Sequence, residues 1–220
     1  MRFAVSNGNR IPVCVFLKPP RSGEVKTRLI PAVGADGAAM LAQSFFEDIW
    51  EAVHSLEWAR PILATTEFVN FGSEVWLQGE GDLGKKLENI LRRALRESTA
   101  ALALGADSPG LPMRLLENAH EALEKSDAVL GPSEDGGFYL FGLKNCPDKL
   151  LSGIRWSQPD TFSQTMSRLR QAGLSVSILE HWFDVDTPKD LQRLRSLIEA
   201  KTILAPHTAQ VFARSHVAQP

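Results

Sequence analysis

The chain has 220 residues, of which 44% are hydrophobic, enough to build a sizeable core within one compact domain. Its formal net charge of -2 leaves no basic excess, so a surface that binds nucleic acid through phosphate contacts is not expected. The two cysteines, Cys14 and Cys146, form no Cys-x-x-Cys pair, which argues against a zinc site and a disulfide scaffold. The first residues lack a secretory signal and no stretch approaches the ~20 apolar residues of a membrane span, so we expect a cytoplasmic protein.

Strand and helix signals alternate along the chain. The apolar run over residues 11–17, closed by Pro19 and Pro20, predicts a buried strand, and helical spacing of apolar residues from Gly34 onward predicts a long amphipathic helix. Alternation of this kind is typical of a three-layer α/β/α sandwich with a mostly parallel central sheet. Further strands are predicted over residues 61–65, 74–77, 100–104, 128–130, 138–143 and 175–179, and helices over residues 83–95, 112–124, 161–171 and from Thr187 onward.

The loop after the first strand is the first candidate site, because ligands of open parallel sheets bind at the carboxyl ends of the strands. It reads PPRSGEVKTRL and combines a glycine with three cations, a composition that suits phosphates. It matches neither the Walker loop nor the G-x-G-x-x-G fingerprint, and a solvated basic turn is the alternative. The residues predicted to contact phosphates are Lys18, Arg21, Gly23, Lys26 and Arg28. Two of them, Lys26 and Arg28, are also predicted to be catalytic.

Two aspartates at strand ends are candidate metal ligands. Asp107, in the sequence GADSP, follows an almost wholly apolar strand, although it could also cap the next helix together with Ser108. Asp186 lies in the sequence DVDTPKDL, where Thr187 and the proline after it mark a helix start and leave Asp186 without a structural role. Mg²⁺ is usually held by one or two carboxylates and substrate phosphates, so we expect Mg²⁺ or Mn²⁺ here, with Asp184 as a substitute or supporting group.

A polar loop, GPSEDGGFY, contributes candidate substrate contacts. Its two glycines, Gly136 and Gly137, allow close approach to a ligand, although a tight hairpin turn explains them equally well. We expect Glu134 and Asp135 to bind substrate hydroxyls, and Asp135 to act as a base. Trp156 could line the acceptor side, although a lone tryptophan more often packs in a core. The histidines show neither ligand spacing nor a nucleophile motif, so triad chemistry is not supported.

Together, these segments resemble a family of bacterial proteins described as nucleotide-diphospho-sugar transferases, in the same order over residues 11–198. Similar proteins include glycosyltransferases of the GT-A fold and, more remotely, guanylyl- and cytidylyltransferases. The resemblance implies a GT-A-like fold, a nucleotide in a cleft at the N-terminal half of the sheet, and Mg²⁺ on Asp107 and Asp186. The proline-led first loop departs from the G-x-G-x-R-M-like loop of sugar-nucleotide pyrophosphorylases, so their base contacts are not carried over to it. We expect one nucleotide-binding transferase domain over residues 1–204 and a C-terminal tail over residues 205–220.

Three functions fit this pattern. The leading hypothesis is glycosyl transfer from a nucleoside diphosphate sugar to an acceptor, because the acidic Glu134 and Asp135 suit sugar hydroxyls better than a phosphorylated acceptor. The alternative is nucleotidyl transfer from a nucleoside triphosphate with release of pyrophosphate, which the three cations around Arg21 favour. The third is a nucleotide-binding regulator without turnover, since a fold alone does not establish activity. The sequence does not indicate the nucleobase, the acceptor or the oligomeric state.

Overall fold

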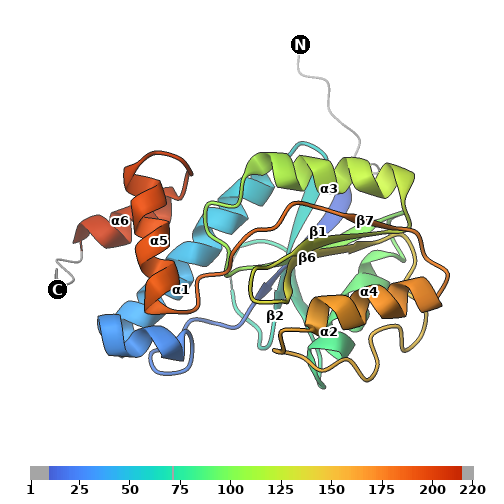
Figure 1. Ribbon diagram of the computed structural model, residues 1–220, viewed down its shortest axis with the longest axis horizontal. Coiled ribbons are helices and arrows are strands. Elements are labelled where there is room, and N and C mark those ends of the chain that lie inside the picture. The colour runs from blue at the N-terminus through green and yellow to red at the C-terminus, as the bar shows by residue number, and fades with distance from the viewer. Residues whose placement is uncertain (1–9, 71, 215–220) are drawn as a thin grey trace, which may run out of the picture.

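A seven-stranded sheet forms the centre of the computed structural model, which describes residues 10–70 and 72–214 (Figure 1). The strand order is β3-β2-β1-β4-β6-β5-β7. Only β6 runs against its neighbours within the described sheet, so the predicted mostly parallel sheet is confirmed. The strands are β1 Ile11–Leu17, β2 Ala59–Thr65, β3 Val75–Leu77, β4 Ala101–Gly105, β5 Ala128–Pro132, β6 Phe138–Leu143 and β7 Val176–Ile178.

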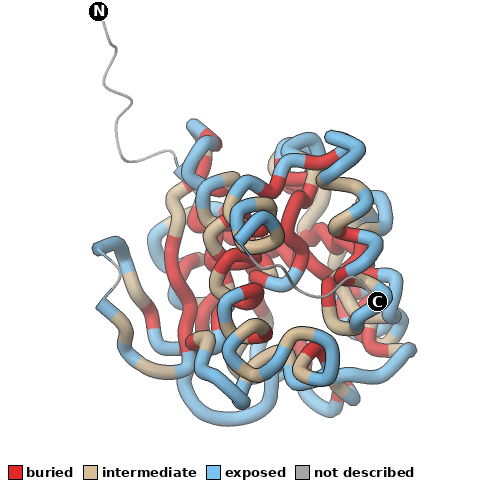
Figure 2. Tube along the Cα trace, turned by 90° about the vertical axis from the view of Figure 1, so that its left-hand side faces the viewer, coloured by how far each residue is buried: buried red, intermediate tan, exposed pale blue. Residues whose placement is uncertain are grey.

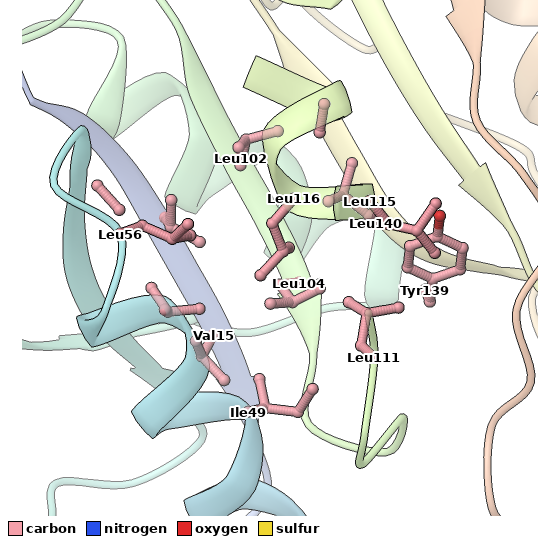
Figure 3. Packing of buried hydrophobic residues seen from close by; sticks show 14 of the residues in the cluster. Val15, Ile49, Leu56, Leu102, Leu104, Leu111, Leu115, Leu116, Tyr139 and Leu140 are labelled. Atoms are coloured by element: carbon pink, nitrogen blue, oxygen red, sulfur yellow. The ribbon is translucent and has the colours of Figure 1, made fainter. Parts of the chain in front are cut away.

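Helices cover both faces of the sheet, which completes the predicted three layers. On one face, α1 (Ile30–His54) and α3 (Met113–Lys125) pack on alternate residues of the strands, such as Val15 and Leu104. Figure 3 shows these two side chains meeting Ile49 of α1 and leucines of α3. On the other face, α2 (Leu83–Ala94) and α4 (Thr161–Gln171) cover the intervening residues. Because successive side chains of a strand point to opposite faces, the sheet has one hydrophobic core on each face. Both cores lie in the buried centre of the molecule in Figure 2.

The helix starts follow the local sequence. The long helix predicted from Gly34 is confirmed, but α1 also includes residues before Gly34, whose φ of 73° interrupts the helical geometry. The start predicted at Thr187 is confirmed as well, because Thr187 caps α5 (Pro188–Glu199). Its side chain accepts a hydrogen bond from the backbone N–H of Asp190, whose carboxylate accepts one from the N–H of Thr187.

Residues Thr27–His54, which form the 3-10 helix η2 (Thr27–Leu29) and α1, are long and apolar enough to cross a bilayer, with a mean hydropathy of 1.3. In this structure, the apolar side of α1 is used by the protein core, where Phe45, Phe46 and Ile49 are buried. The opposite side carries charged residues such as Glu51, which is exposed. The composition of the segment is therefore accounted for by the packing of the apolar side of one long core helix.

The segment after residue 204 was expected to be a tail, whereas Pro206–Arg214 form helix α6, packed on α1. The physical reason is Asp48 of α1, whose carboxylate accepts hydrogen bonds from the backbone N–H groups of His207 and Thr208, at 2.8 and 3.1 Å, and from the Thr208 hydroxyl at 2.6 Å. A carboxylate from another helix thus caps α6, which its own sequence does not reveal. The rest of the expected tail, residues 215–220, and the start of the expected domain, residues 1–9, lie outside the described residues.

The turn between β5 and β6 is locked against the segment before α4. Gly136 has a φ of +89°, and a Cβ atom there would lie 2.1 Å from the carbonyl oxygen of Pro159. The carbonyl of Gly136 also accepts a hydrogen bond from the N–H of Phe162 at 2.8 Å. The hairpin interpretation of this glycine is thus confirmed, and the turn and the segment hold one another in place at the carboxyl edge of the sheet.

Substitution of Asp48 by alanine should lower the free energy of unfolding by about 2–3 kcal/mol, because three donors at the start of α6 lose their acceptor. The matched control is Glu51→Ala, which removes an exposed carboxylate 2.9 Å from the His207 imidazole and should cost less than about 0.5 kcal/mol. Urea unfolding of the three proteins measures both values. Equal stability of the two variants would contradict the cap.

Alanine at Gly136 should destabilise the protein by at least about 3 kcal/mol, because the backbone conformation is strained and the new methyl group collides with Pro159. Gly173→Ala separates the two causes: its φ of +75° is similar, but open space surrounds the added Cβ, so we expect a cost of about 1 kcal/mol. Chemical denaturation of both variants gives the comparison. A similar loss in both would show that the contact with Pro159 is unimportant.

Candidate functional site

A cavity of about 520 Å³ opens where β1 and β4 end. One wall is the loop after β1, which contributes Lys18, Lys26 and Arg28. The segment before α4 also contributes to the lining, at Ser157, Gln158 and Pro159, together with Asp135 of the β5–β6 turn. Asp107, from the end of β4, and Asp186 complete the lining. The predicted loops are therefore brought together at the carboxyl edge of the sheet, although they are widely separated in sequence.

Lys26 lies between the two aspartates. Its ammonium nitrogen is 2.8 Å from an oxygen of Asp107 and 2.8 Å from an oxygen of Asp186. The lysine side chain is only 6% exposed, whereas those of Asp107 and Asp186 are 56% and 42% exposed. Burial alone would lower the pKa of Lys26, but the two carboxylates outweigh it and raise the pKa, so the group is charged. The site therefore holds a fixed cation in contact with two accessible anions.

The backbone at Lys26 is unusual, with φ of 44° and ψ of 42° in the left-handed region. This residue ends the loop, and its carbonyl accepts a hydrogen bond at 2.8 Å from the N–H of Leu29, within the short helix η2. A left-handed conformation is costly for a residue with a side chain. The ion pairs with Asp107 and Asp186 provide a compensating interaction that holds the lysine in this conformation.

The segment after β7 carries Asp186 across the ends of the strands. The N–H of Trp182 bonds to the carbonyl of Pro132 in β5, and the N–H of Val185 bonds to the carbonyl of Asp107 beyond β4. Since the side chains of an extended segment alternate with a period of two, Asp184 and Asp186 lie on the same side of it, toward the loops that follow the strands. Backbone pairing thus places Asp186 next to Asp107, as the strand-end prediction requires.

Asp184 serves as a connection between two loops. Its carboxylate accepts hydrogen bonds from the hydroxyls of Ser108, after β4, and Ser133, after β5. Burial raises its pKa to about 6, although the two hydroxyl contacts act in the opposite direction. Asp184 therefore binds protein hydroxyls and links the loop after β5 to the turn that carries Asp107.

Several other predicted residues lie outside the cavity lining. Arg21 is exposed and forms an ion pair with Glu67 at 2.7 Å, and Gly23 lies in open space in the same loop. Glu134 forms a two-pronged ion pair with Arg193 of α5, at 2.6 and 3.0 Å, which lowers the pKa of the carboxyl group. Arg21 and Glu134 therefore have ion-pair partners within the protein, and the ligand contacts predicted for these residues stay predictions.

Three predicted substrate residues have structural roles of their own. Gly136 forms the turn described above, and Gly137 donates its N–H to the carboxylate of Asp135 at 2.9 Å. Trp156 packs edge-on against Phe138 and lies in the core under α2 and α4, as the packing alternative had it. Asp135 and the cations Lys18, Lys26 and Arg28 remain as the predicted substrate and phosphate contacts that line the cavity.

Sequence reasoning missed Gln158 and Pro159 as cavity residues. They follow Trp156 in a stretch with no charged cluster or glycine pair, and their position depends on the long connection from β6 to α4. That connection is tied to α2, where the buried carboxylate of Glu88 accepts a hydrogen bond at 2.8 Å from the N–H of Leu151. The neighbouring Arg92 donates to the carbonyls of Cys146 and Pro147. No local sequence pattern marks these contacts.

The cavity can also be tested for its fit to a divalent cation. Asp107 and Asp186 place one oxygen each against the same ammonium group, so their carboxylates converge on a single cation. Among the described residues, no group of three or more His, Cys, Asp or Glu side chains could hold a metal ion. Two carboxylates fit Mg²⁺ or Mn²⁺ when ligand phosphates supply the remaining oxygens. The donor set therefore suits a cation that binds together with a phosphorylated ligand.

Comparisons with known proteins agree with this geometry. Residues 50–158 match the model of a family described as an uncharacterized protein conserved in bacteria, DUF2064. A crystal structure from Desulfovibrio desulfuricans G20, described as a candidate nucleotide-diphospho-sugar transferase, is 30% identical with a TM-score of 0.83, covering 92% of this chain and 93% of that one.

More distant relatives share the fold. The 2-phospho-L-lactate guanylyltransferase of Methanothermobacter thermautotrophicus is 23% identical over 81% of this chain and 82% of its own length. The structure of CMP:2-keto-3-deoxy-manno-octonic acid synthetase in complex with CTP is 14% identical, with a TM-score of 0.57 over 87% of this chain and 99% of that one. The chain therefore belongs to the DUF2064 family of bacterial proteins, whose fold is shared with nucleotide-diphospho-sugar transferases and with guanylyl- and cytidylyltransferases.

Proposed function

We propose that the protein is a metal-dependent nucleotidyltransferase, which joins the nucleotidyl group of a nucleoside triphosphate to a phosphorylated acceptor and releases pyrophosphate. The observation that carries the proposal is the charge arrangement of the cavity, with Lys18, Lys26 and Arg28 on one wall and two converging carboxylates beside them. Cations bind phosphates, and paired carboxylates bind the Mg²⁺ that accompanies a triphosphate.

The contacts of Glu134 favour this reaction over transfer of a sugar. The argument for a sugar depended on two neighbouring acidic side chains facing the substrate. One of them, Glu134, is neutralised by Arg193 outside the cavity lining, so of that pair only Asp135 lines the cavity. The guanylyltransferase and the CTP-bound synthetase that share the fold support the same choice.

In the proposed reaction, an oxygen of the acceptor phosphate attacks the α-phosphorus of the nucleoside triphosphate. A phosphorus–oxygen bond forms there, while the bond from the α-phosphorus to the bridging oxygen breaks and pyrophosphate leaves with the bonding electrons. Lys18 and Arg28 would bind the triphosphate from the loop wall, and the ammonium group of Lys26 would stabilise the negative charge that develops. Asp135 would orient the acceptor, since it lines the same cavity from the β5–β6 turn.

Asp107 and Asp186 would hold the divalent cation. A bound Mg²⁺ neutralises phosphate charge and polarises the phosphoryl oxygens, which lowers the barrier to attack. The two exposed carboxylates are held in place by the backbone bond between Val185 and Asp107. The protein thus contributes a rigid pair of oxygen ligands, and the triphosphate would contribute the others.

Glycosyl transfer remains the second candidate, because the 30% identical Desulfovibrio structure is described as a candidate nucleotide-diphospho-sugar transferase. In that reaction, the anomeric carbon of the sugar would be attacked and a nucleoside diphosphate would leave. The same cations and carboxylates would bind the diphosphate. The two reactions therefore differ in their leaving group, which an experiment can identify.

Incubation with Mg²⁺, a panel of nucleoside triphosphates and pooled phosphorylated metabolites should release pyrophosphate, and chelation of Mg²⁺ should abolish the release. A parallel panel of nucleotide sugars tests for release of nucleoside diphosphates. Diphosphate release alone would replace the proposal by glycosyl transfer. Nucleotide binding without either product would identify a regulator instead.

Variants test the site itself. Asp107→Asn should lower the rate of pyrophosphate release by at least about 100-fold, because one of two metal carboxylates is neutralised. Arg28→Gln should lower kcat/KM by about 10-fold or more, since a cation facing the phosphates is removed. Lys144→Gln is the matched control, because this lysine lines a separate cavity beside the start of β1, and its activity should stay within about twofold. Full activity of Asp107→Asn would exclude the proposed site.

A further inference from the structure

Lys26 occupies the place where the two candidate metal ligands converge. Both carboxylates direct an oxygen to its ammonium nitrogen at 2.8 Å, as an oxygen-liganded cation would require. A divalent ion that uses the same oxygens cannot enter without moving the ammonium group or sharing its partners. This geometry sets Lys26 and the metal in competition.

The burial of Lys26 makes the competition strong. Its side chain is 6% exposed, and its ammonium nitrogen lies over the Phe45 ring, 6.0 Å from the ring centroid. A cation withdrawn from water to this extent needs anionic partners, and Asp107 and Asp186 are its ion-pair partners within the described structure. Metal entry therefore requires a new counter-ion for Lys26.

A triphosphate in the same cavity would supply that counter-ion. Lys26 lines the cavity with Lys18 and Arg28, so phosphates bound to this wall lie within reach of its side chain. Arg28 differs from Lys26 in one respect that the experiment below uses: it is exposed, and no described carboxylate forms an ion pair with it. Of these two cations, Lys26 is thus the one placed to exchange its carboxylate partners for phosphates.

We propose that Lys26 is a resident counter-cation of the metal site, which keeps Asp107 and Asp186 from binding a divalent cation until a nucleotide phosphate draws the lysine away. Metal and nucleotide then bind in a coupled manner, and each strengthens the binding of the other. The inference depends on the proposed metal site, and it assigns to Lys26 control over metal binding in addition to phosphate binding.

Titration of Mn²⁺ into the full-length protein without nucleotide, followed by calorimetry, tests the competition. Lys26→Met should bind Mn²⁺ at least about tenfold more tightly than the wild type, because the competing charge is gone while the length of the side chain is kept. Arg28→Met is the matched control: it removes one positive charge from the same wall and should change Mn²⁺ affinity by less than about threefold. Asp107→Asn should weaken binding in every background.

Equal Mn²⁺ affinity of wild type and Lys26→Met would overturn the inference, as would equal gains in the Lys26 and Arg28 variants. If the wild-type protein binds Mn²⁺ in the presence of a non-hydrolysable triphosphate, the proposed metal site still stands after either of these results. Absence of Mn²⁺ binding in all proteins, with and without that triphosphate, would exclude the metal site together with the inference.

A second measurement uses the wild-type protein alone and so does not depend on the folding of a variant. Acetic anhydride should label Lys26 slowly in the metal-free protein, because its ammonium group is buried and paired. Saturation with Mn²⁺ should raise this labelling several-fold, as measured by mass spectrometry, while labelling of Lys144 stays constant. Unchanged protection of Lys26 at saturating Mn²⁺ would show that the ion binds without displacing it.

Discussion

The ion pairs from Lys26 to Asp107 and Asp186 join three parts of the chain that the fold brings to one edge of the sheet. Each partner alone would be unfavourable: a buried ammonium group lacks water, and two converging carboxylates repel one another. Together they also stabilise the left-handed backbone at Lys26, and with it the start of η2. The same groups are the ones that a phosphorylated ligand and a divalent cation need. Stability of the loop and readiness for a ligand therefore depend on one set of charges.

The supporting contacts show how this edge is kept rigid. Asp184 connects the ends of β4 and β5 through Ser108 and Ser133, and Glu134 ties the β5–β6 turn to α5 through Arg193. These acidic groups satisfy protein donors and leave Asp107, Asp186 and Asp135 as the aspartates that line the cavity. Acidic residues that are neighbours in sequence thus divide into those that hold the loops and those that line the cavity.

Most of the architecture could be predicted from the sequence because it depends on local patterns. Apolar periodicity located the strands and helices, and the capping sequence at Thr187 located the start of α5. Strand ends also indicated Asp107 and Asp186, since carboxyl edges of parallel strands gather in one place. What could not be predicted depends on contacts between distant residues. Asp48 caps α6 from 160 residues away, Arg193 binds Glu134 outside the cavity lining, and Glu88 positions the connection that carries Gln158.

The reversed direction of β6 affects how substrate preference can change within such a fold. Because β6 is antiparallel, β5 and β6 meet at the ligand edge in a short turn, where related parallel folds would have a variable loop leading into a helix. The turn is also fixed by the contact between Gly136 and Pro159, which leaves little room for insertions. Diversity on this side of the cavity must then arise in the long connection between β6 and α4, which has no regular strand or helix and lines the cavity at Ser157 and Gln158. Differences in length and composition of that connection are where proteins of this architecture can reshape the cavity while its lysine, arginine and aspartate side chains stay unchanged.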